Sequence, residues 1–136
     1  MSTVSELIRS DADGSLSFCD YTLGAKAKLD NFEHAGDVYK VKTFKEITKL
    51  EKGGVFAYES VPGTAVTGLR AVDGGVSFNV EGPEDAEITI GLAEETSYDV
   101  KIGGTDAGTM TTGLGGKLTI SVELGAEPVA VEIKRA

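Results

Sequence analysis

The sequence predicts an all-β protein built as an antiparallel β-sandwich, and three observations support this class. Apolar side chains alternate with polar ones, as along residues 117–124 (KLTISVEL), which is the period of a half-buried strand. Such stretches recur about every 8 to 12 residues, a spacing typical of sandwiches and barrels. The chain also has 18 glycines and 3 prolines, which suits tight turns between short strands.

The strand pattern is clearest in the second half of the chain. Strands are expected at residues 55–61, 64–72, 76–81, 87–92, 98–102, 108–112, 117–124 and 129–134. Asp73-Gly74 is the strongest hairpin signal between them, because primed turns need the positive φ angles that these residue types tolerate. The glycines before Lys117 do not form a phosphate-binding loop, since Leu118 stands where such a loop needs serine or threonine.

The first 42 residues carry a weaker pattern. Thr3 and Glu6 have the spacing of a capping box, so a short N-terminal helical turn is expected there. Two early strands are expected, one around residues 16–18 and one over residues 27–32, followed by a better defined strand at 37–41.

Residues 43–50 (TFKEITKL) fit two structures. Thr43 and Glu46 form a second capping-box match, which favours a helix. The same segment leads through Gly53-Gly54 into the strand at 55–61, which is the layout of a hairpin, and we favour the hairpin. The expected organisation is an N-terminal arm and small β-subdomain over residues 1–60 and a sandwich body over residues 61–136, together forming one unit.

Composition narrows the classes of function. The 136 residues fit one domain, and the net charge of -9 opposes binding to nucleic acid or to anionic lipid. No stretch of 18 apolar residues is present, so no membrane insertion is expected. The N-terminal segment is too polar for a signal peptide, which makes the cytoplasm the default location, with leaderless export or assembly into a particle left open.

The charges are unevenly distributed. Residues 1–52 carry 8 basic and 9 acidic side chains, whereas residues 53–136 carry 5 and 13. The basic zone of the first part consists of Lys26, Lys28, Lys40, Lys42, Lys45, Lys49 and Lys52. One interpretation is that these lysines discourage pairing at strand edges, and the other is that they make an acidic-to-basic contact between subunits.

The sequence contains no convincing catalytic set and no cofactor motif. His34 is the one histidine, is expected in an exposed loop because it lies in a polar stretch, and is accompanied by no nucleophile motif. Cys19 is the one cysteine and is expected to be a small buried side chain. Because zinc sites use several histidines and cysteines, no metal site of that kind is expected.

Acidic loops leave two further possibilities. Residues 11–15 (DADGS) resemble the start of a calcium-binding loop, but Thr22 stands where the closing glutamate belongs, so a simple turn is expected. The carboxylates Glu94, Glu95 and Asp99 are expected to be solvated, although paired carboxylates in a cleft would serve glycoside hydrolysis.

Aromatic side chains offer a modest candidate for sugar binding. The chain has no tryptophan, and Tyr98 is expected in the core. Tyr58 beside Tyr39 and Arg70 would make an exposed platform, which is the arrangement that a carbohydrate-binding module requires.

Residues 88–133 resemble the closing strands of immunoglobulin-like or fibronectin-type sandwich modules, through Leu92, Tyr98 and Gly116. This resemblance implies an immunoglobulin-like fold. The whole chain also resembles a group of short uncharacterised bacterial proteins that sometimes carry the label endosialidase. The residues do not support that activity, since Arg9, Arg70 and Arg135 are widely scattered and the strands are too few for a propeller.

The leading hypothesis for function is a non-enzymatic structural or interaction protein that forms homo-oligomers or binds a protein partner. The alternative is a carbohydrate-binding or adhesin-like module that binds a glycan, and a third hypothesis is a small carboxylate-dependent glycoside hydrolase. The candidate surface for a ligand or partner consists of Tyr39, Lys40, Lys42, Lys45, Tyr58 and Arg70.

Overall fold

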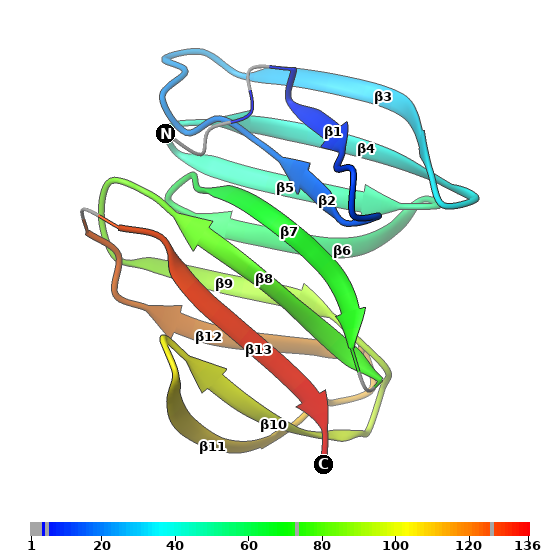
Figure 1. Ribbon diagram of the computed structural model, residues 1–136, viewed down its shortest axis with the longest axis vertical. Coiled ribbons are helices and arrows are strands. Elements are labelled where there is room, and N and C mark those ends of the chain that lie inside the picture. The colour runs from blue at the N-terminus through cyan, green and yellow to red at the C-terminus, as the bar shows by residue number, and fades with distance from the viewer. Residues whose placement is uncertain (1–3, 5, 73, 126) are drawn as a thin grey trace.

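The computed structural model describes residues 4, 6–72, 74–125 and 127–136, which fold into two antiparallel sheets (Figure 1). Within these residues, seven strands form one sheet and six form the other. The seven-stranded sheet contains, in spatial order, β1 (Ile8–Ser10), β2 (Leu16–Phe18), β7 (Ala65–Val72), β8 (Gly75–Glu81), β13 (Val129–Arg135), β10 (Ser97–Ile102) and β11 (Thr105–Thr111). The six-stranded sheet contains β12 (Lys117–Val122), β9 (Ala86–Gly91), β6 (Val55–Val61), β5 (Ile47–Lys52), β4 (Asp37–Phe44) and β3 (Ala27–His34).

The all-β class and the two-layer antiparallel arrangement are as predicted. Each strand expected from residue 37 onward is present, with ends that shift by at most three residues. The two early strands are present as β2 and β3. The ambiguous segment 43–50 is a hairpin, because β4 ends at Phe44 and β5 starts at Ile47.

The prediction of a helical turn at the N-terminus is wrong: the described residues of this segment contain no helix. Thr3 lies outside them, and the chain from Ile8 forms β1, which pairs with β2. Burial explains this outcome, since Ile8 is 2% exposed and packs into the core, whereas a single helical turn is unstable alone. Asp73 of the predicted hairpin also lies outside the described residues, while β7 and β8 pair around it as a hairpin would.

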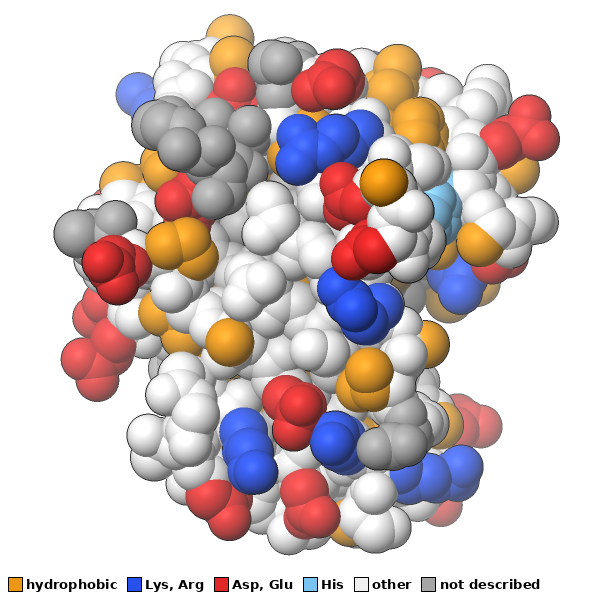
Figure 2. All heavy atoms as spheres, viewed as in Figure 1, with side chains coloured by type: hydrophobic (Ala, Val, Ile, Leu, Met, Phe, Trp, Pro, Cys, Tyr) orange, Lys and Arg blue, Asp and Glu red, His pale blue; other side chains and the backbone are white. Residues whose placement is uncertain are grey.

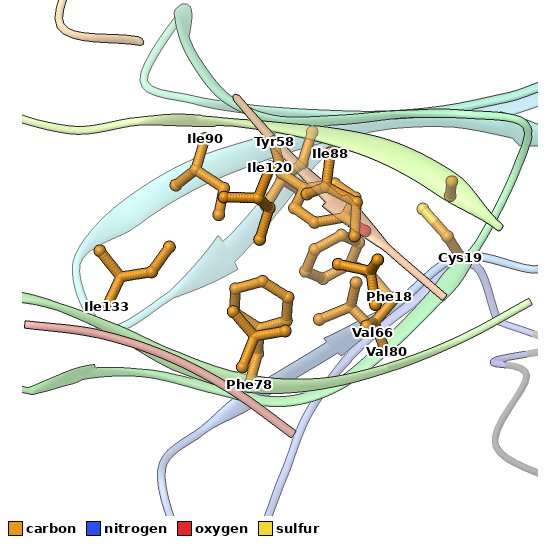
Figure 3. Packing of buried hydrophobic residues seen from close by; sticks show 14 of the residues in the cluster. Phe18, Cys19, Tyr58, Val66, Phe78, Val80, Ile88, Ile90, Ile120 and Ile133 are labelled. Carbon is orange, nitrogen blue, oxygen red and sulfur yellow. The ribbon is translucent and has the colours of Figure 1, made fainter. Parts of the chain in front are cut away.

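Strands from both parts of the chain contribute to each sheet. β2 pairs with β7 and β1 pairs with β2, so both belong to the seven-stranded sheet, and β3 to β6 join β9 and β12 in the other sheet. The buried apolar side chains form one cluster between the sheets. Its centre contains Tyr58, which packs edge-on against Phe18 and Phe78 with ring centroids 5.4 and 5.8 Å apart (Figure 3).

A buried hydroxyl network adjoins this aromatic centre. Thr64 accepts or donates hydrogen bonds with the Tyr58 and Ser60 hydroxyls at 2.8 and 2.7 Å. The Thr48 hydroxyl donates to the Thr64 carbonyl at 2.8 Å and contacts the Thr43 hydroxyl at 3.0 Å. Each of these side chains points into the sandwich, so the network satisfies groups that would be costly to bury unpaired.

Three one-residue bulges bend strands at the same end of the sandwich. In β3 the register shifts between Leu29 and Phe32, where Asn31 has a φ of 59°. In β6 it shifts around Ala57, and in β7 it shifts between Thr67 and Arg70, where Gly68 has a φ of 67°. Because a bulge bends a strand and re-aims the side chains beyond it, these three positions decide what faces the interior there.

Candidate functional surfaces

The six residues predicted as a functional surface do not lie on one surface. Tyr39 and Tyr58 point into the sandwich, and Arg70 on β7 of the other sheet lines the same inter-sheet pocket. Lys40 and Lys42 point outward from β4, and Lys45 lies exposed in the β4–β5 turn. Side chains alternate along a strand, so Tyr39 and Lys40 are neighbours in sequence but belong to separate surfaces.

The first surface, the lysine row, consists of Lys28, Lys42 and Lys49. Lys28 on β3 is the direct cross-strand partner of Lys42 on β4, and Lys42 is the direct partner of Lys49 on β5. Side chains directly opposite each other in an antiparallel pair have Cβ atoms about 5 Å apart. Three positive charges therefore stand side by side on adjacent strands, an arrangement that destabilises an isolated sheet.

Little within the described residues compensates the lysine row. Lys49 forms an ion pair with Glu59, the next residue along the same cross-strand line, at 3.7 Å. Lys28 and Lys42 make no ion pair with any residue that the structure describes. A lysine on an edge strand discourages pairing with another chain, which explains Lys28 on the edge strand β3. This reason does not apply to Lys42 and Lys49, which lie on interior strands.

An acidic end lies elsewhere on the molecule, where the β8–β9 and β12–β13 loops meet. Its exposed carboxylates are Glu84, Asp85, Glu87, Glu123 and Glu127. The two loops are joined by a hydrogen bond of 3.1 Å from the Leu124 amide to the Asp85 carboxylate. Residues 81–87 and 122–128 contain no lysine or arginine, and acidic side chains gather at the corresponding margin of the molecule, at the left in Figure 2.

The second surface is an inter-sheet pocket of about 360 Å³. Its apolar floor is formed by Leu16, Leu50, Tyr58, Leu69, Phe78 and Ile90, which come from both sheets. Its rim is formed by His34, Asp37, Lys52 and Arg70. In Figure 2 the outline is hollowed at the right, with the histidine side chain at the upper lip of the hollow.

The bulges and the small side chains explain why the sandwich is open here. Gly68 lets β7 bend before Arg70, and the bulge in β6 places Ala57 in the pocket wall. Ala35, Ala71 and Gly91 line the same pocket. Protein interiors are normally close-packed. Here the wall residues are too small to fill the space between the sheets, so the pocket stays open.

Ion pairs hold the charged side chains of the rim. Arg70 contacts Asp13 at 2.9 Å, and Lys52 contacts Asp37 at 3.5 Å. Hydrogen bonds from Ser15 lower the pKa of Asp13, so its carboxylate is ionised and keeps its attraction for Arg70. His34 is held by a hydrogen bond of 2.7 Å between its Nδ1 and the Ser10 hydroxyl, and its ring meets Tyr39 edge-on.

The hypothesis that Tyr39 and Tyr58 form an exposed platform is wrong, because both side chains are buried. Tyr58 is 2% exposed and Tyr39 is 8% exposed, and burial raises the pKa of both phenols. Tyr58 alternates with Glu59, which takes the outer face, so the tyrosine must face the core. Tyr98 is in the core as predicted, at 1% exposure.

The remaining sequence candidates have structural roles. Cys19 is fully buried as predicted, and burial raises the pKa of its thiol to about 12, which makes it unreactive in the folded protein. The 11–15 segment is a turn, as predicted, in which the Gly14 amide donates to the Asp11 carbonyl. In the described part of the chain, no three His, Cys, Asp or Glu side chains are grouped so as to hold a metal ion.

His34 was expected in an exposed loop, but it lies at the end of β3 and is half-buried on the pocket rim. Lys28, Lys49 and Lys52 were not singled out as site residues, although they belong to the basic zone. The cross-strand register places both Lys28 and Lys49 opposite Lys42, and this register is the signal that would have identified these two.

No family model, curated protein or solved structure matches this chain. Among the described residues, no helix has the length and apolar character needed to cross a membrane.

Proposed function

We propose that this protein is a non-enzymatic interaction protein that associates with further copies of itself through the lysine row. The observation that carries the proposal is the direct cross-strand alignment of Lys28, Lys42 and Lys49 on the outer face of the six-stranded sheet. A like-charge row costs stability in the isolated chain. Proteins tend to retain such locally unfavourable arrangements at functional positions, where a partner compensates them.

The acidic end is the complementary surface that the chain itself supplies. Its two loops concentrate carboxylates without an intervening basic residue, whereas the lysine row concentrates ammonium groups. Opposite potentials of this kind steer association and fix its orientation. Because the two surfaces are different patches of one molecule, the contact is head-to-tail and joins copies into rings or open chains.

The immunoglobulin-like type of sandwich also stays a proposal, and one hydrogen bond supports it. The Ala93 amide donates to the Tyr98 hydroxyl at 3.0 Å, five residues upstream of the tyrosine. A buried tyrosine bonded back to the preceding backbone at a strand start is the tyrosine corner of immunoglobulin-like domains.

The test is the molar mass in solution, measured by light scattering after size exclusion at about 20 mM and about 500 mM salt. Salt shortens the range of electrostatic attraction, so we expect oligomers at low salt and a smaller mass at high salt. The triple variant Lys28→Glu/Lys42→Glu/Lys49→Glu is expected to be monomeric at both concentrations.

A charge-exchange control makes the test specific. Adding Glu84→Lys, Glu123→Lys and Glu127→Lys to the triple variant restores the attraction with its direction reversed, so the oligomer is expected to return. Lys101→Glu, an exposed lysine on β10 of the other sheet, is the matched control and leaves the mass unchanged. A wild-type protein that is monomeric at every concentration and at low salt would overturn the proposal.

A further inference from the structure

We propose that the inter-sheet pocket binds a small carboxylate that carries an apolar or aromatic body. This inference is independent of the self-association proposed above, because it depends on the inner face of the six-stranded sheet. The pocket volume of about 360 Å³ lies within the range of pockets that hold small molecules.

The floor of the pocket fits an apolar body. Leu16, Leu69 and Phe78 from the seven-stranded sheet face Leu50 and Ile90 from the other sheet. Apolar surface left open to water is unfavourable, and a ligand that covers it gains the free energy of removing that surface from water. Tyr58 also lines the pocket, and its hydroxyl is bonded to Thr64 in the buried network, so it is not needed by the ligand.

The rim of the pocket fits a carboxylate, because it is rich in hydrogen-bond donors. Lys52 and Arg70 flank the opening, and His34 adds an imidazole whose Nδ1 is bonded to Ser10. An arginine has five N–H donors in a planar fork that matches a carboxylate, and Arg70 donates to Asp13 from its Nη2. Within the described residues, Arg70 makes no second hydrogen bond, so the rest of the fork can receive a ligand.

The aspartates that pair with Arg70 and Lys52 do not prevent this recognition. The side chains of the Arg70–Asp13 pair are 52% and 54% exposed, and those of the Lys52–Asp37 pair are 51% and 45% exposed. Ion pairs as exposed as these contribute little stability, so sharing or exchanging a partner costs little. A ligand carboxylate that is partly desolvated by the apolar floor forms the stronger charge-assisted bond.

The experiment measures binding of 4-phenylbutyrate and its neutral amide, 4-phenylbutyramide, by calorimetry and by ¹⁵N chemical-shift mapping. We expect the acid to bind about tenfold more tightly than the amide, since only the acid makes charge-assisted bonds with the rim. The amides that shift are expected to belong to the pocket wall, such as those of Ala57, Leu69 and Ala71, and not to the lysine row.

Variants separate the rim from the floor. Arg70→Gln is expected to remove the preference for the acid, whereas Arg9→Gln, which removes a similar Arg–Asp pair outside the pocket, leaves it intact. Ala57→Leu fills the pocket and is expected to abolish binding of both compounds. Ala71→Leu is a second filling variant, because Ala71 lines the pocket from an exposed position and its enlargement does not disturb the core.

Three results would overturn the inference. One is shifts confined to Lys28, Lys42 and Lys49, which would show that the acid binds the outer lysine row. Another is a wild-type protein that binds neither compound. The third is binding that survives both filling variants while these variants keep the wild-type melting temperature.

Discussion

The inner and outer faces of the six-stranded sheet differ in burial and in charge. On β4, Tyr39, Val41 and Thr43 are buried against the other sheet, while Lys40 and Lys42 between them face solvent. Away from the pocket, the inner face carries buried apolar side chains and hydrogen-bonded hydroxyl groups, whereas the outer face carries a like-charge row. A single step along the strand therefore separates residues that specify the fold from residues that are available to a partner.

The largest expected effect comes from breaking the inner face at Tyr58. We expect Tyr58→Ala to lower the free energy of unfolding by about 3 to 5 kcal/mol, as truncation of large buried aromatics does. The ring contacts both Phe18 and Phe78, and its hydroxyl is bonded within the buried network, so both apolar and polar contacts are lost. Urea denaturation followed by circular dichroism measures the change.

Two controls define that experiment. Tyr58→Phe keeps the ring and removes the hydroxyl, so its cost is expected to be smaller, about 0.5 to 1.5 kcal/mol for one lost hydrogen bond, because the Thr64 hydroxyl keeps its bond to Ser60. Lys40→Ala on the outer face is expected to change stability by less than about 0.5 kcal/mol. A Tyr58→Ala protein as stable as the wild type would mean that this side chain lies outside the core.

The difference between the faces also explains what the sequence could predict. Period-two alternation identified nearly every strand, because one face of each is buried and the other is solvated. The same alternation predicts the burial of Tyr58. Glu59 is charged and has to face water, so its neighbour Tyr58 has to face the core. The platform hypothesis was wrong because it considered residue types without the face that they share.

The two candidate surfaces depend on bulges, which period-two patterns do not reveal. If β3 paired regularly with β4 and had no bulge near Asn31, Lys28 would face Thr43 and point inward, and the lysine row would lack its third member. The pocket depends likewise on the bulges near Ala57 and Gly68. An isolated glycine within a strand is a signal for a bulge, so Gly68 was recognisable in principle, whereas the spacing between the sheets was not.

A second, smaller effect is the dependence of stability on pH that burial of the Cys19 thiol causes. Burial raises the pKa of its thiol from 9.0 to about 12, with the neighbouring Asp20 adding to the shift and Thr43 and Thr48 opposing it. Because the folded pKa is above the unfolded one, the stabilisation is complete below about pH 9 and is lost as the pH rises toward 12. We expect the loss between pH 9 and pH 10 to be about 1 kcal/mol.

Comparison with Cys19→Ala isolates this contribution from the other groups that titrate in alkali. The variant is expected to lose less stability over the same pH interval, even if it is less stable overall because of the small cavity. Rapid labelling of the native protein by a thiol reagent at pH 8 would contradict the burial on which the prediction depends.

The smallest expected effect has the opposite sign and lies on the outer face. Lys42→Gln removes the central charge of the lysine row and relieves repulsion with both Lys28 and Lys49, so we expect stability to rise by about 0.2 to 1 kcal/mol at low salt. The gain is expected to shrink as salt screens the repulsion, whereas the effect of Tyr58→Ala is not. Denaturation at two salt concentrations measures both effects, at a protein concentration low enough for any oligomer to be dissociated.

Lys134→Gln is the control. It removes a lysine that is paired with Glu132, so it is expected to bring no gain in stability. If Lys42→Gln destabilised the monomer, the lysine row would be a stabilising part of the sheet, and its charges would give no reason to invoke a partner.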